Sequence, residues 1–471
     1  MMKTLQVDVA IIGAGTAGLY ALREVKRANK SFVLIDKGPL GTTCARVGCM
    51  PSKVALHAAE LWSMRQEQKH YGISGVEQLE IDRAAAWAKV RAMRDDFAGG
   101  AADNAIKSAG EHLLMGEAKF LEPTVLQVEG EDGIQRIEAK AVIIAVGSRP
   151  VVPSFLTPFS DYLITTDKLF ELEKLPKRLG LLGLGVIGLE MGLALQRLGV
   201  KVVGADMAKA IGGIRDPEVA KYALQAFADN FPMFLGESAK LEEAEQGVQL
   251  VSGDNRVTVD KVLVALGRRP NIDKLNLAEA GFKLDERGMP EFNLNTLQIE
   301  DYPVYLVGDA NAYRTLMHEA AAEGAIVGFN ASRDLPQAFE RKTSLAIAFT
   351  QPDIISVGAS FTDLDEDETL IGAAYSKNDG RSRILSSKEG VLRIYADKKD
   401  GRLLGAAMVG ARAEHLGQYL ALAISQKMTA HELLAAPFYH PVVEEMIQSA
   451  LQDIARKMPE SPYPFGLTVM N

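Results

Sequence analysis

The sequence Val7-Asp8-Val9-Ala10-Ile11-Ile12-Gly13-Ala14-Gly15-Thr16-Ala17-Gly18 decides how the first part of the chain folds. Its apolar run predicts a buried strand, and the residues from Leu19 onward continue as a helix. A second apolar run, residues 31–35, follows this helix and ends at Asp36. Strand, glycine turn, helix, strand and acid in this order predict a unit that binds a dinucleotide.

The glycines and the acid each have a chemical role in such a unit. Gly13 permits a tight turn, Gly15 lets backbone N–H groups approach a pyrophosphate, and Gly18 lets the helix pack closely on the strand. The positive end of the helix dipole favours the phosphate charge. Asp36 is placed to accept a hydrogen bond from a ribose hydroxyl.

The same pattern returns later in the chain. A strand over residues 179–182 leads into Gly183-Leu184-Gly185-Val186-Ile187-Gly188, and after a helix the strand 200–205 ends at Asp206. The chain is therefore expected to bind two dinucleotides. An acid at this place suits the free 2′-hydroxyl of NAD, whereas a 2′-phosphate would favour arginine. The nearest cation after Asp206 is Lys209.

Each unit closes with a strand that leads into Gly-x-Arg-Pro. These segments are residues 141–150, which contain Gly147, and residues 262–270, which contain Gly267. They form an internal repeat, and the prolines near residue 150 mark a domain boundary.

The remaining part of the chain changes character twice. A buried strand over residues 302–307 ends at Asp309, where an acid can bind a ribityl or ribose hydroxyl, and residues 316–329 are expected to form a helix. From about residue 343, short strands followed by helices predict a separate α+β domain. The expected strands are 345–349, 354–357, 391–395 and 403–408, and the expected helices are 414–427 and 441–457.

Both cysteines of the chain lie in one stretch, Gly41-Thr42-Thr43-Cys44-Ala45-Arg46-Val47-Gly48-Cys49-Met50-Pro51-Ser52-Lys53. Two cysteines in 471 residues do not make a secreted disulfide scaffold. A metal site of the usual kind needs further cysteine or histidine partners nearby, and the stretch offers none, so we predict no metal. We interpret the pair as a redox-active disulfide.

Composition limits the possible partners. The net charge is -9 and the hydrophobic fraction is 47%, which is ample for large buried cores. This composition argues against binding to nucleic acid and against a polybasic membrane anchor. No apolar run reaches the ~18 residues that span a bilayer. These features favour a cytoplasmic protein.

A histidine near the C-terminus has acidic neighbours in the sequence Phe438-Tyr439-His440-Pro441-Val442-Val443-Glu444-Glu445. Pro441 suits the first position of the following helix, which leaves His440 at the cap. Either Glu444 or Glu445 could hold the ring and set its basicity. Taken alone, the alternative of an ordinary surface histidine stays open.

The chain resembles the class I flavoprotein disulfide reductases in the order of its motifs. This order is a first glycine unit, Cys-x4-Cys-x-Pro-Ser-Lys, a second glycine unit, Gly-Asp and a late His-Pro. This family includes the dihydrolipoamide dehydrogenases, glutathione reductases and mercuric reductases. The resemblance implies an α/β fold with two doubly wound domains, one for FAD and one for NAD, and a C-terminal α+β dimerisation domain. The implied divisions are 1–150 for FAD, 151–270 for NAD, 271–342 completing the FAD domain, and 343–471 for dimerisation.

The resemblance also implies roles for single residues. Cys49 would be the thiol next to the flavin, which forms the charge-transfer complex, and Cys44 would exchange with the substrate. His440 would be the acid/base for Cys44, held by Glu445 rather than Glu444. In this family the histidine comes from the partner subunit, which implies a homodimer.

The implied cofactor positions form two sets. Those for FAD are Gly13, Gly15, Gly18, Asp36, Lys37, Thr43, Lys53, Ala118, Gly147, Asp309 and Met317. Those for NAD are Gly183, Gly185, Gly188, Glu190, Asp206 and Gly267. Lys53 and Glu190 match a family ion pair near the flavin N5, and we count both as catalytic.

Among the family, dihydrolipoamide dehydrogenase fits best, which predicts oxidation of dihydrolipoamide or a lipoyl group with NAD⁺. Glutathione reductases usually take NADPH, and mercuric and large thioredoxin reductases carry extra C-terminal cysteines. The chain departs from the usual pattern at Thr42 (glycine), Arg46 (asparagine), Phe438 (histidine) and Val442 (Ser or Thr). Arg46 beside the disulfide could favour an anionic disulfide or alter the cysteine pKa values. Two alternatives stay open: a reductase of another small or protein disulfide, and an interaction or sensor flavoprotein with little turnover.

Overall fold

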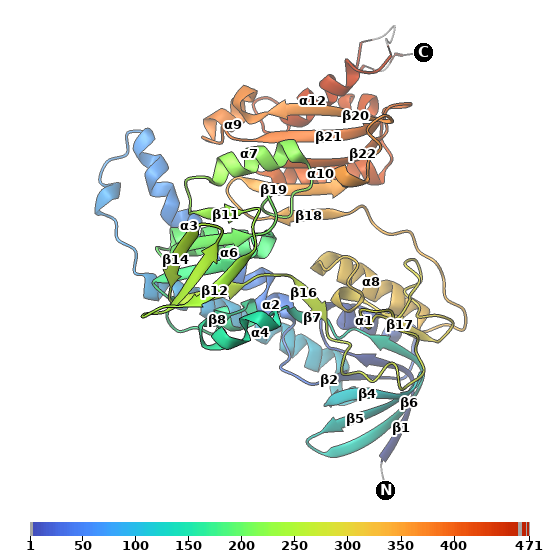
Figure 1. Cartoon of the computed structure of the whole chain (residues 1–471). Coiled ribbons are helices and arrows are strands. Elements are labelled where there is room, and N and C mark those ends of the chain that lie inside the picture. Colours follow the sequence, from blue (N-terminus) through green and yellow to red (C-terminus); the bar gives the residue numbers. More distant parts are fainter. Residues whose placement is uncertain (1–2, 460–463, 468, 471) are drawn as a thin grey trace.

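The first sheet of the computed structural model, which describes residues 3–459, 464–467 and 469–470, is built around the first glycine unit (Figure 1). The strands run in the order β3-β2-β1-β6-β5-β4, and β17 also pairs with β6. Their bounds are β1 Lys3–Ile12, β2 Phe32–Asp36, β3 Leu113–Met115, β4 Glu117–Glu122, β5 Val125–Gly130, β6 Gly133–Ile144 and β17 Val304–Leu306. β1, β2, β3, β6 and β17 are parallel, and β4 and β5 are antiparallel.

The segment 271–342 returns to this first sheet. Val304 of β17 pairs with Val142 of β6. Helix α8 (Met317–Asn330) then packs on α1 (Thr16–Arg27), where a Cβ added to Gly324 would lie 2.3 Å from the Ala17 carbonyl oxygen. This close approach explains why glycine stands at that position of α8.

The second sheet is formed by the second glycine unit and is entirely parallel, in the order β11-β10-β9-β15-β8. Its strands are β8 Leu163–Ile164, β9 Arg178–Leu182, β10 Lys201–Asp206, β11 Met233–Leu235 and β15 Lys261–Val264, with helices α5 Thr166–Leu169, α6 Val186–Arg197 and α7 Pro217–Phe227. A small antiparallel sheet of β12 Ala239–Glu243, β13 Val248–Ser252 and β14 Asn255–Val259 accompanies it.

The two Gly-x-Arg-Pro segments pair with each other. β7 (Ser148–Pro150) and β16 (Arg268–Pro270) form an antiparallel ribbon in which Arg268 is opposite Pro150. The sequence repeat is therefore a structural junction between the two dinucleotide units.

The C-terminal part is an antiparallel sheet with helices, in the order β18-β19-β22-β21-β20. Its elements are β18 Leu345–Ala348, β19 Asp353–Gly358, β20 Thr369–Tyr375, α9 Gly380–Ile384, β21 Val391–Asp397, β22 Leu403–Gly410, α10 Ala413–Ser425, α11 Ala430–Leu434 and α12 Glu445–Ala455. The predicted α/β fold with a C-terminal α+β unit is thus confirmed (Figure 1).

One local expectation was wrong, and one strand was not predicted. The last helix begins at Glu445 and not at Pro441, because residues 445–447 still bond three residues back, to the carbonyls of Val442, Val443 and Glu444. β20 was missed because small residues interrupt its pattern. One of them, Gly372, lies under α12, where a Cβ would come 2.0 Å from the Ala450 carbonyl oxygen.

A buried carboxylate joins the second unit to the C-terminal sheet. Asp216 is 1% exposed and caps α7 through the N–H groups of Glu218 and Val219. Arg393 Nη1 and the Tyr395 hydroxyl, both on β21, each donate to it at 2.7 Å. A paired buried charge of this kind fixes the orientation of the two parts, since either partner alone would be costly.

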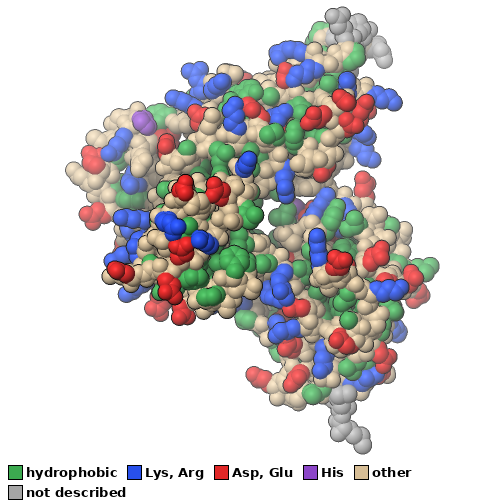
Figure 2. Space-filling view, viewed as in Figure 1, with side chains coloured by type: hydrophobic (Ala, Val, Ile, Leu, Met, Phe, Trp, Pro, Cys, Tyr) green, Lys and Arg blue, Asp and Glu red, His purple; other side chains and the backbone are tan. Residues whose placement is uncertain are grey.

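The surface carries charges of both signs. On the face shown in Figure 2, acidic and basic side chains are interspersed. None of the helices that the structure describes is long and apolar enough to cross a membrane.

Candidate active site

The two cysteines lie on two consecutive helices. Cys44 is on the short helix α2 (Thr43–Val47), and Cys49 is the first residue of α3 (Cys49–His70), with Gly48 between them. Both thiols are free, Cys44 partly buried and Cys49 exposed. The stretch therefore places both cysteines at the start of a long helix.

The pair shares one hydrogen bond, and its consequences differ for the two thiols. The bond from Cys44, together with the charge of Lys53 one turn along α3, lowers the pKa of Cys49 to about 7. The same bond and burial raise the pKa of Cys44. The N-terminus of α3 also favours a thiolate at Cys49. Cys49 is thus the more acidic thiol of the pair.

Thr42, just before this pair, has an unusual backbone. Its φ is 58° and its ψ is 147°, and its side chain accepts a hydrogen bond from the Ala45 N–H at 3.1 Å. A β-branched residue rarely adopts positive φ. The conformation that the family's glycine suits is therefore retained here by a threonine that also caps α2.

Lys53 and Glu190 form an ion pair between the first two units. The Lys53 Nζ lies 2.7 Å from Glu190 Oε2, and Glu190, on α6, is only 3% exposed. Glu190 Oε1 also accepts the Phe349 N–H at 2.9 Å, and the Lys53 ammonium lies 4.7 Å from the centroid of the Phe349 ring. Sequence reasoning missed Phe349, since nothing in the local pattern points to it.

The two glycine loops have nearly the same geometry at their first and third glycines. A Cβ on Gly13 would lie 2.2 Å from the Ala145 carbonyl oxygen, and one on Gly183 would lie 2.4 Å from that of Ala265. In each loop the third glycine packs against the carbonyl group of the first glycine. The distance from an added Cβ to the first glycine's carbonyl oxygen is 1.9 Å, both for Gly18 and for Gly188.

The middle glycines differ from these, because the space beside them is open. Neither Gly15 nor Gly185 has an atom within 4 Å of an added Cβ. A ligand can therefore approach the backbone there, as a pyrophosphate does at a helix N-terminus.

Both acids also bind their loops. Asp36 Oδ2 accepts the Ala14 N–H at 2.7 Å, and Asp206 Oδ2 accepts the Leu184 N–H at 2.6 Å. Each carboxylate has two oxygens with further acceptor capacity, so binding of a ribose hydroxyl stays compatible with these bonds.

A cavity of about 570 Å³ lies at the first loop. Of the expected FAD positions, it is lined by Gly13, Gly15, Asp36, Lys37, Thr43, Ala118 and Gly147. The remaining ones, Gly18, Lys53, Asp309 and Met317, are not among its lining residues. Its lining also includes residues that were not predicted, among them Thr42, Arg46, Val47, Ser148, Arg149 and Arg268.

Asp309 is held from the junction between the units. The Ser148 hydroxyl donates to Asp309 Oδ2 at 2.7 Å and accepts from Arg268 Nε at 2.8 Å. Arg268 belongs to the second unit by sequence, yet the ribbon of β7 and β16 brings it to the first unit. No local signal could have placed it there.

His440 and Glu445 form a second group in the C-terminal part. Nδ1 of His440 lies 2.9 Å from Glu445 Oε1, and Oε2 accepts the Val442 N–H at 3.1 Å. The hydrogen bond to His440 lowers the pKa of Glu445. With Nδ1 engaged, Nε2 is the free nitrogen of a side chain that is 78% exposed. Glu444 takes no part in this contact.

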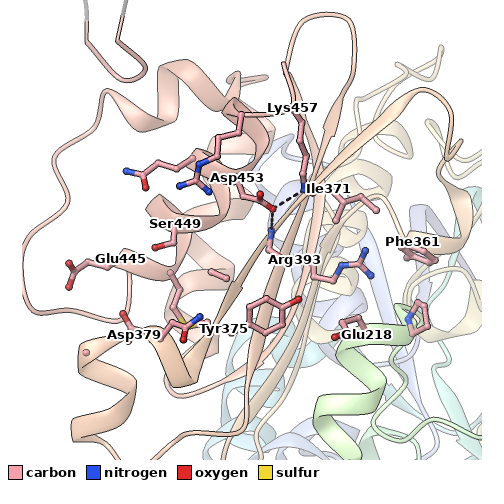
Figure 3. Close-up of a pocket in the computed structure, with 18 of the residues that line it drawn as sticks. Glu218, Phe361, Ile371, Tyr375, Asp379, Arg393, Glu445, Ser449, Asp453 and Lys457 are labelled. Carbon is pink, nitrogen blue, oxygen red and sulfur yellow. Dashed lines mark hydrogen bonds and ion pairs between the residues drawn. The ribbon is translucent and has the colours of Figure 1, made fainter. Parts of the chain in front are cut away.

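The His440 group borders a hollow of about 1220 Å³ that reaches from α12 across β20 and β21 to α7. Ser449 and Asp453 lie on α12, and Lys457, just beyond its end, donates to Asp453 at 2.8 Å (Figure 3). Neither cysteine lines this hollow. Between the described residues, no hydrogen bond or ion pair joins His440 to Cys44 or Cys49.

The arrangement was compared with known proteins. Residues 7–324 match the family described as pyridine nucleotide-disulphide oxidoreductase, and residues 345–451 match its dimerisation domain. The chain belongs to this family. The predicted recognition, the FAD-dependent oxidoreductase activity and the cofactors FAD and NAD are thereby confirmed, and the dimerisation domain supports a homodimer.

Relatives and solved structures agree with this membership. Dihydrolipoyl dehydrogenases from Geobacillus stearothermophilus and Staphylococcus aureus are both 29% identical to the chain, over 95% of it and 96% of their own length. A HOCl-induced flavoprotein disulfide reductase, RclA from Escherichia coli, and LpdA from Mycobacterium tuberculosis share the fold. For each, the TM-score is 0.82 at 22% identity, covering 95% of this chain and 99% of theirs.

The residues present fit the family's cofactors. The open space beside Gly15 and Gly185 leaves room for a pyrophosphate at each loop, and Asp36 and Asp206 stand at the positions of ribose acceptors. Among the described residues, no group of three or more His, Cys, Asp or Glu could hold a metal ion.

Proposed function

We propose that the chain oxidises a small dithiol, dihydrolipoamide or a protein-bound lipoyl group, with NAD⁺ as electron acceptor. The observation that carries this proposal is the placement of Cys44 on α2 and of Cys49 at the first residue of α3, with Lys53 one turn further along α3 and held by Glu190. The pKa of Cys49 is lowered to about 7. The relatives named dihydrolipoyl dehydrogenase support this substrate.

The two cysteines have separate roles in the proposed reaction. A substrate thiolate attacks Sγ of Cys44 in the oxidised pair, the Cys44–Cys49 bond breaks, and Cys49 leaves as a thiolate. Its lowered pKa makes Cys49 a good leaving group. The second substrate thiol gives its proton to His440 and attacks the substrate sulfur bound to Cys44. The substrate leaves as a disulfide, and Cys44 takes up the proton.

The cofactors complete the electron transfer. FAD, when bound, supplies two-electron transfer between the reduced cysteine pair and NAD⁺. We assign FAD to the first loop and its cavity, and NAD to the second loop with Asp206. Lys53 holds its charge beside Cys49, and Glu190 fixes Lys53 from α6.

The base in this scheme is supplied by a second copy of the chain. His440 is exposed, its Nε2 is free, and its own chain places no cysteine beside it. We propose that dimerisation brings His440 of one protomer to Cys44 of the other, with Glu445 orienting the ring. We also assign the enzyme to the cytoplasm, where thiols stay reduced.

The experiment is reduction of the purified holoenzyme by NADH, followed by steady-state assays. We expect a long-wavelength absorbance band on reduction, and faster turnover of dihydrolipoamide with NAD⁺ than of other oxidised thiols with NADH. Faster reduction of another disulfide would favour the alternative reductase. The absence of both the band and turnover would leave only the interaction or sensor role.

Single cysteine variants test the separate roles. Cys44→Ser is expected to abolish dithiol turnover while FAD stays bound, because only the exchange thiol is lost. Cys49→Ser is expected to lose the long-wavelength band as well. Dithiol turnover like that of the wild type in Cys44→Ser would reject the assignment of the exchange thiol.

A further inference from the structure

Arg46 lies on a different face of α2 from Cys44. Residues two apart on a helix do not face each other, whereas residues three apart do. Arg46 therefore shares a face with Thr43 and not with Cys44. The cavity at the first loop agrees with this geometry, because Thr43, Arg46 and Val47 line it and neither cysteine does.

The Arg46 side chain runs back along its own chain. Its Cδ and Cγ lie over Gly41, at 3.1 and 3.2 Å from where a Cβ on that glycine would be. Its Nη1 donates one long hydrogen bond, 3.5 Å, to the Pro39 carbonyl oxygen. The guanidinium thus lies toward the end of β2, where Asp36 and Gly38 also line the cavity.

The other cations that line the cavity already have partners. Lys37 and Lys274 both lie near Glu117, at 3.7 and 3.9 Å. Arg149 pairs with Asp273 at 2.6 Å.

Arg268 is also engaged, because it donates twice to Ser148, at 2.8 and 2.7 Å. Within the part of the chain that the structure describes, Arg46 has no carboxylate within 4.0 Å. Most of its N–H donors are therefore available to an anion in the cavity.

We propose that Arg46 binds the pyrophosphate of FAD. The glycine loop offers phosphates only backbone N–H groups and a helix dipole, whereas a guanidinium adds a full charge and a planar, two-pronged donor. An asparagine, the usual family residue here, has neither. This inference rests on FAD occupying the first loop, and it replaces the expectation that Arg46 acts on an anionic disulfide.

The test is the FAD affinity of the holoenzyme and its variants, measured by equilibrium dialysis with flavin fluorescence at low and high salt. A hydrogen bond to a charged group is stronger than one between neutral groups. We therefore expect Arg46→Met and Arg46→Asn to raise the FAD dissociation constant about tenfold or more. Arg46→Lys should retain part of the affinity, because it keeps the charge. The loss should shrink at high salt.

Arg23→Met is the matched control. Arg23 lies on α1, is 61% exposed and pairs with Glu24 at 3.0 Å, outside the cavity lining. The Arg23→Met variant should bind FAD like the wild type. Should Arg46→Met also keep wild-type FAD affinity, the proposal is wrong. A selective rise in KM for an anionic disulfide would then identify Arg46 as a substrate contact.

The outcome is separable from that of the proposed function. If Arg46→Met loses FAD while the wild type fails to turn over any dithiol, the dehydrogenase proposal fails and the role of Arg46 stands. If the wild type turns over dihydrolipoamide and Arg46→Met keeps FAD, the dehydrogenase proposal stands and the role of Arg46 is rejected. Arg46→Lys and Arg46→Asn keep the test informative should Arg46→Met fold poorly.

Discussion

The two dinucleotide units, residues 7–36 and 179–206, have almost the same loop geometry, but the segments that follow them differ. After Asp36 the chain leads to the strained Thr42 and to the cysteine pair, to which we assign the redox chemistry. After Asp206 it continues through Met207, which is 72% exposed, with no redox group. We therefore propose that the glycine loop determines whether a dinucleotide binds, and that the residues after the acid determine which group exchanges electrons with it.

The largest effect is expected at the third glycines. Gly18→Ala and Gly188→Ala each place a Cβ 1.9 Å from a backbone carbonyl oxygen, which cannot move without the loop. We expect each to cost on the order of 3 kcal/mol or more of folding stability, seen as lowered thermal midpoints or insoluble protein. Gly99→Ala in α4 (Arg83–Ala109) is the control, since open space surrounds it. It should be neutral or slightly stabilising.

If either third-glycine variant matched Gly99→Ala, the tight helix–strand contact would not matter in that unit, and the two units would differ more than their geometry suggests.

The middle glycines should separate the cofactors instead. Gly15→Ala and Gly185→Ala meet no protein atom within 4 Å, so the fold should be kept. The added methyl occupies the approach to the pyrophosphate. We expect Gly15→Ala to release FAD about tenfold more readily and Gly185→Ala to raise the KM for NADH about tenfold with FAD retained, each a loss of roughly 1.4 kcal/mol. Loss of FAD from Gly185→Ala would contradict the assignment of the loops.

Much of this comparison could be predicted from the sequence, because its signals are local. Glycine spacing, apolar runs and terminal acids lie within a few residues of one another. The contacts that join the units could not be predicted, because they depend on chain folding over long distances. Arg268 reaches Ser148, which donates to Asp309, only through the pairing of β7 with β16. Phe349 reaches Glu190 only once the C-terminal sheet has packed on α6.

The helix starts show the same limit on a smaller scale. A proline at position 441 is compatible with a first helical turn, yet α12 begins at Glu445 because the intervening backbone forms turns. The pairing of His440 with Glu445 depends on this turn, since the Val442 N–H holds one carboxylate oxygen and His440 the other.

A smaller effect is expected in the pH dependence of the alkylation of Cys49. The segment after Asp206 has no corresponding cysteine. The pKa of Cys49 is lowered to about 7, so its reactive thiolate forms at lower pH than that of an ordinary cysteine near 8.5. Iodoacetamide should therefore alkylate the reduced enzyme at a rate that rises with pH, with a midpoint near 7. Cys44→Ala removes the donor and should move the midpoint upward. An unchanged midpoint in that variant would assign the shift to Lys53 and the helix terminus alone.

The smallest effect concerns Thr42, where the first unit departs from the family's glycine. A threonine at φ 58° is strained by roughly 1–3 kcal/mol, whereas replacing a threonine cap with glycine costs only a few tenths. Thr42→Gly should therefore raise the stability of the holoenzyme by about 1 kcal/mol, measured as a higher thermal midpoint at saturating FAD. Thr43→Gly should lower the thermal midpoint, because it relieves no positive φ and weakens α2. A lower midpoint for Thr42→Gly would mean that the bond from the Ala45 N–H outweighs the backbone strain.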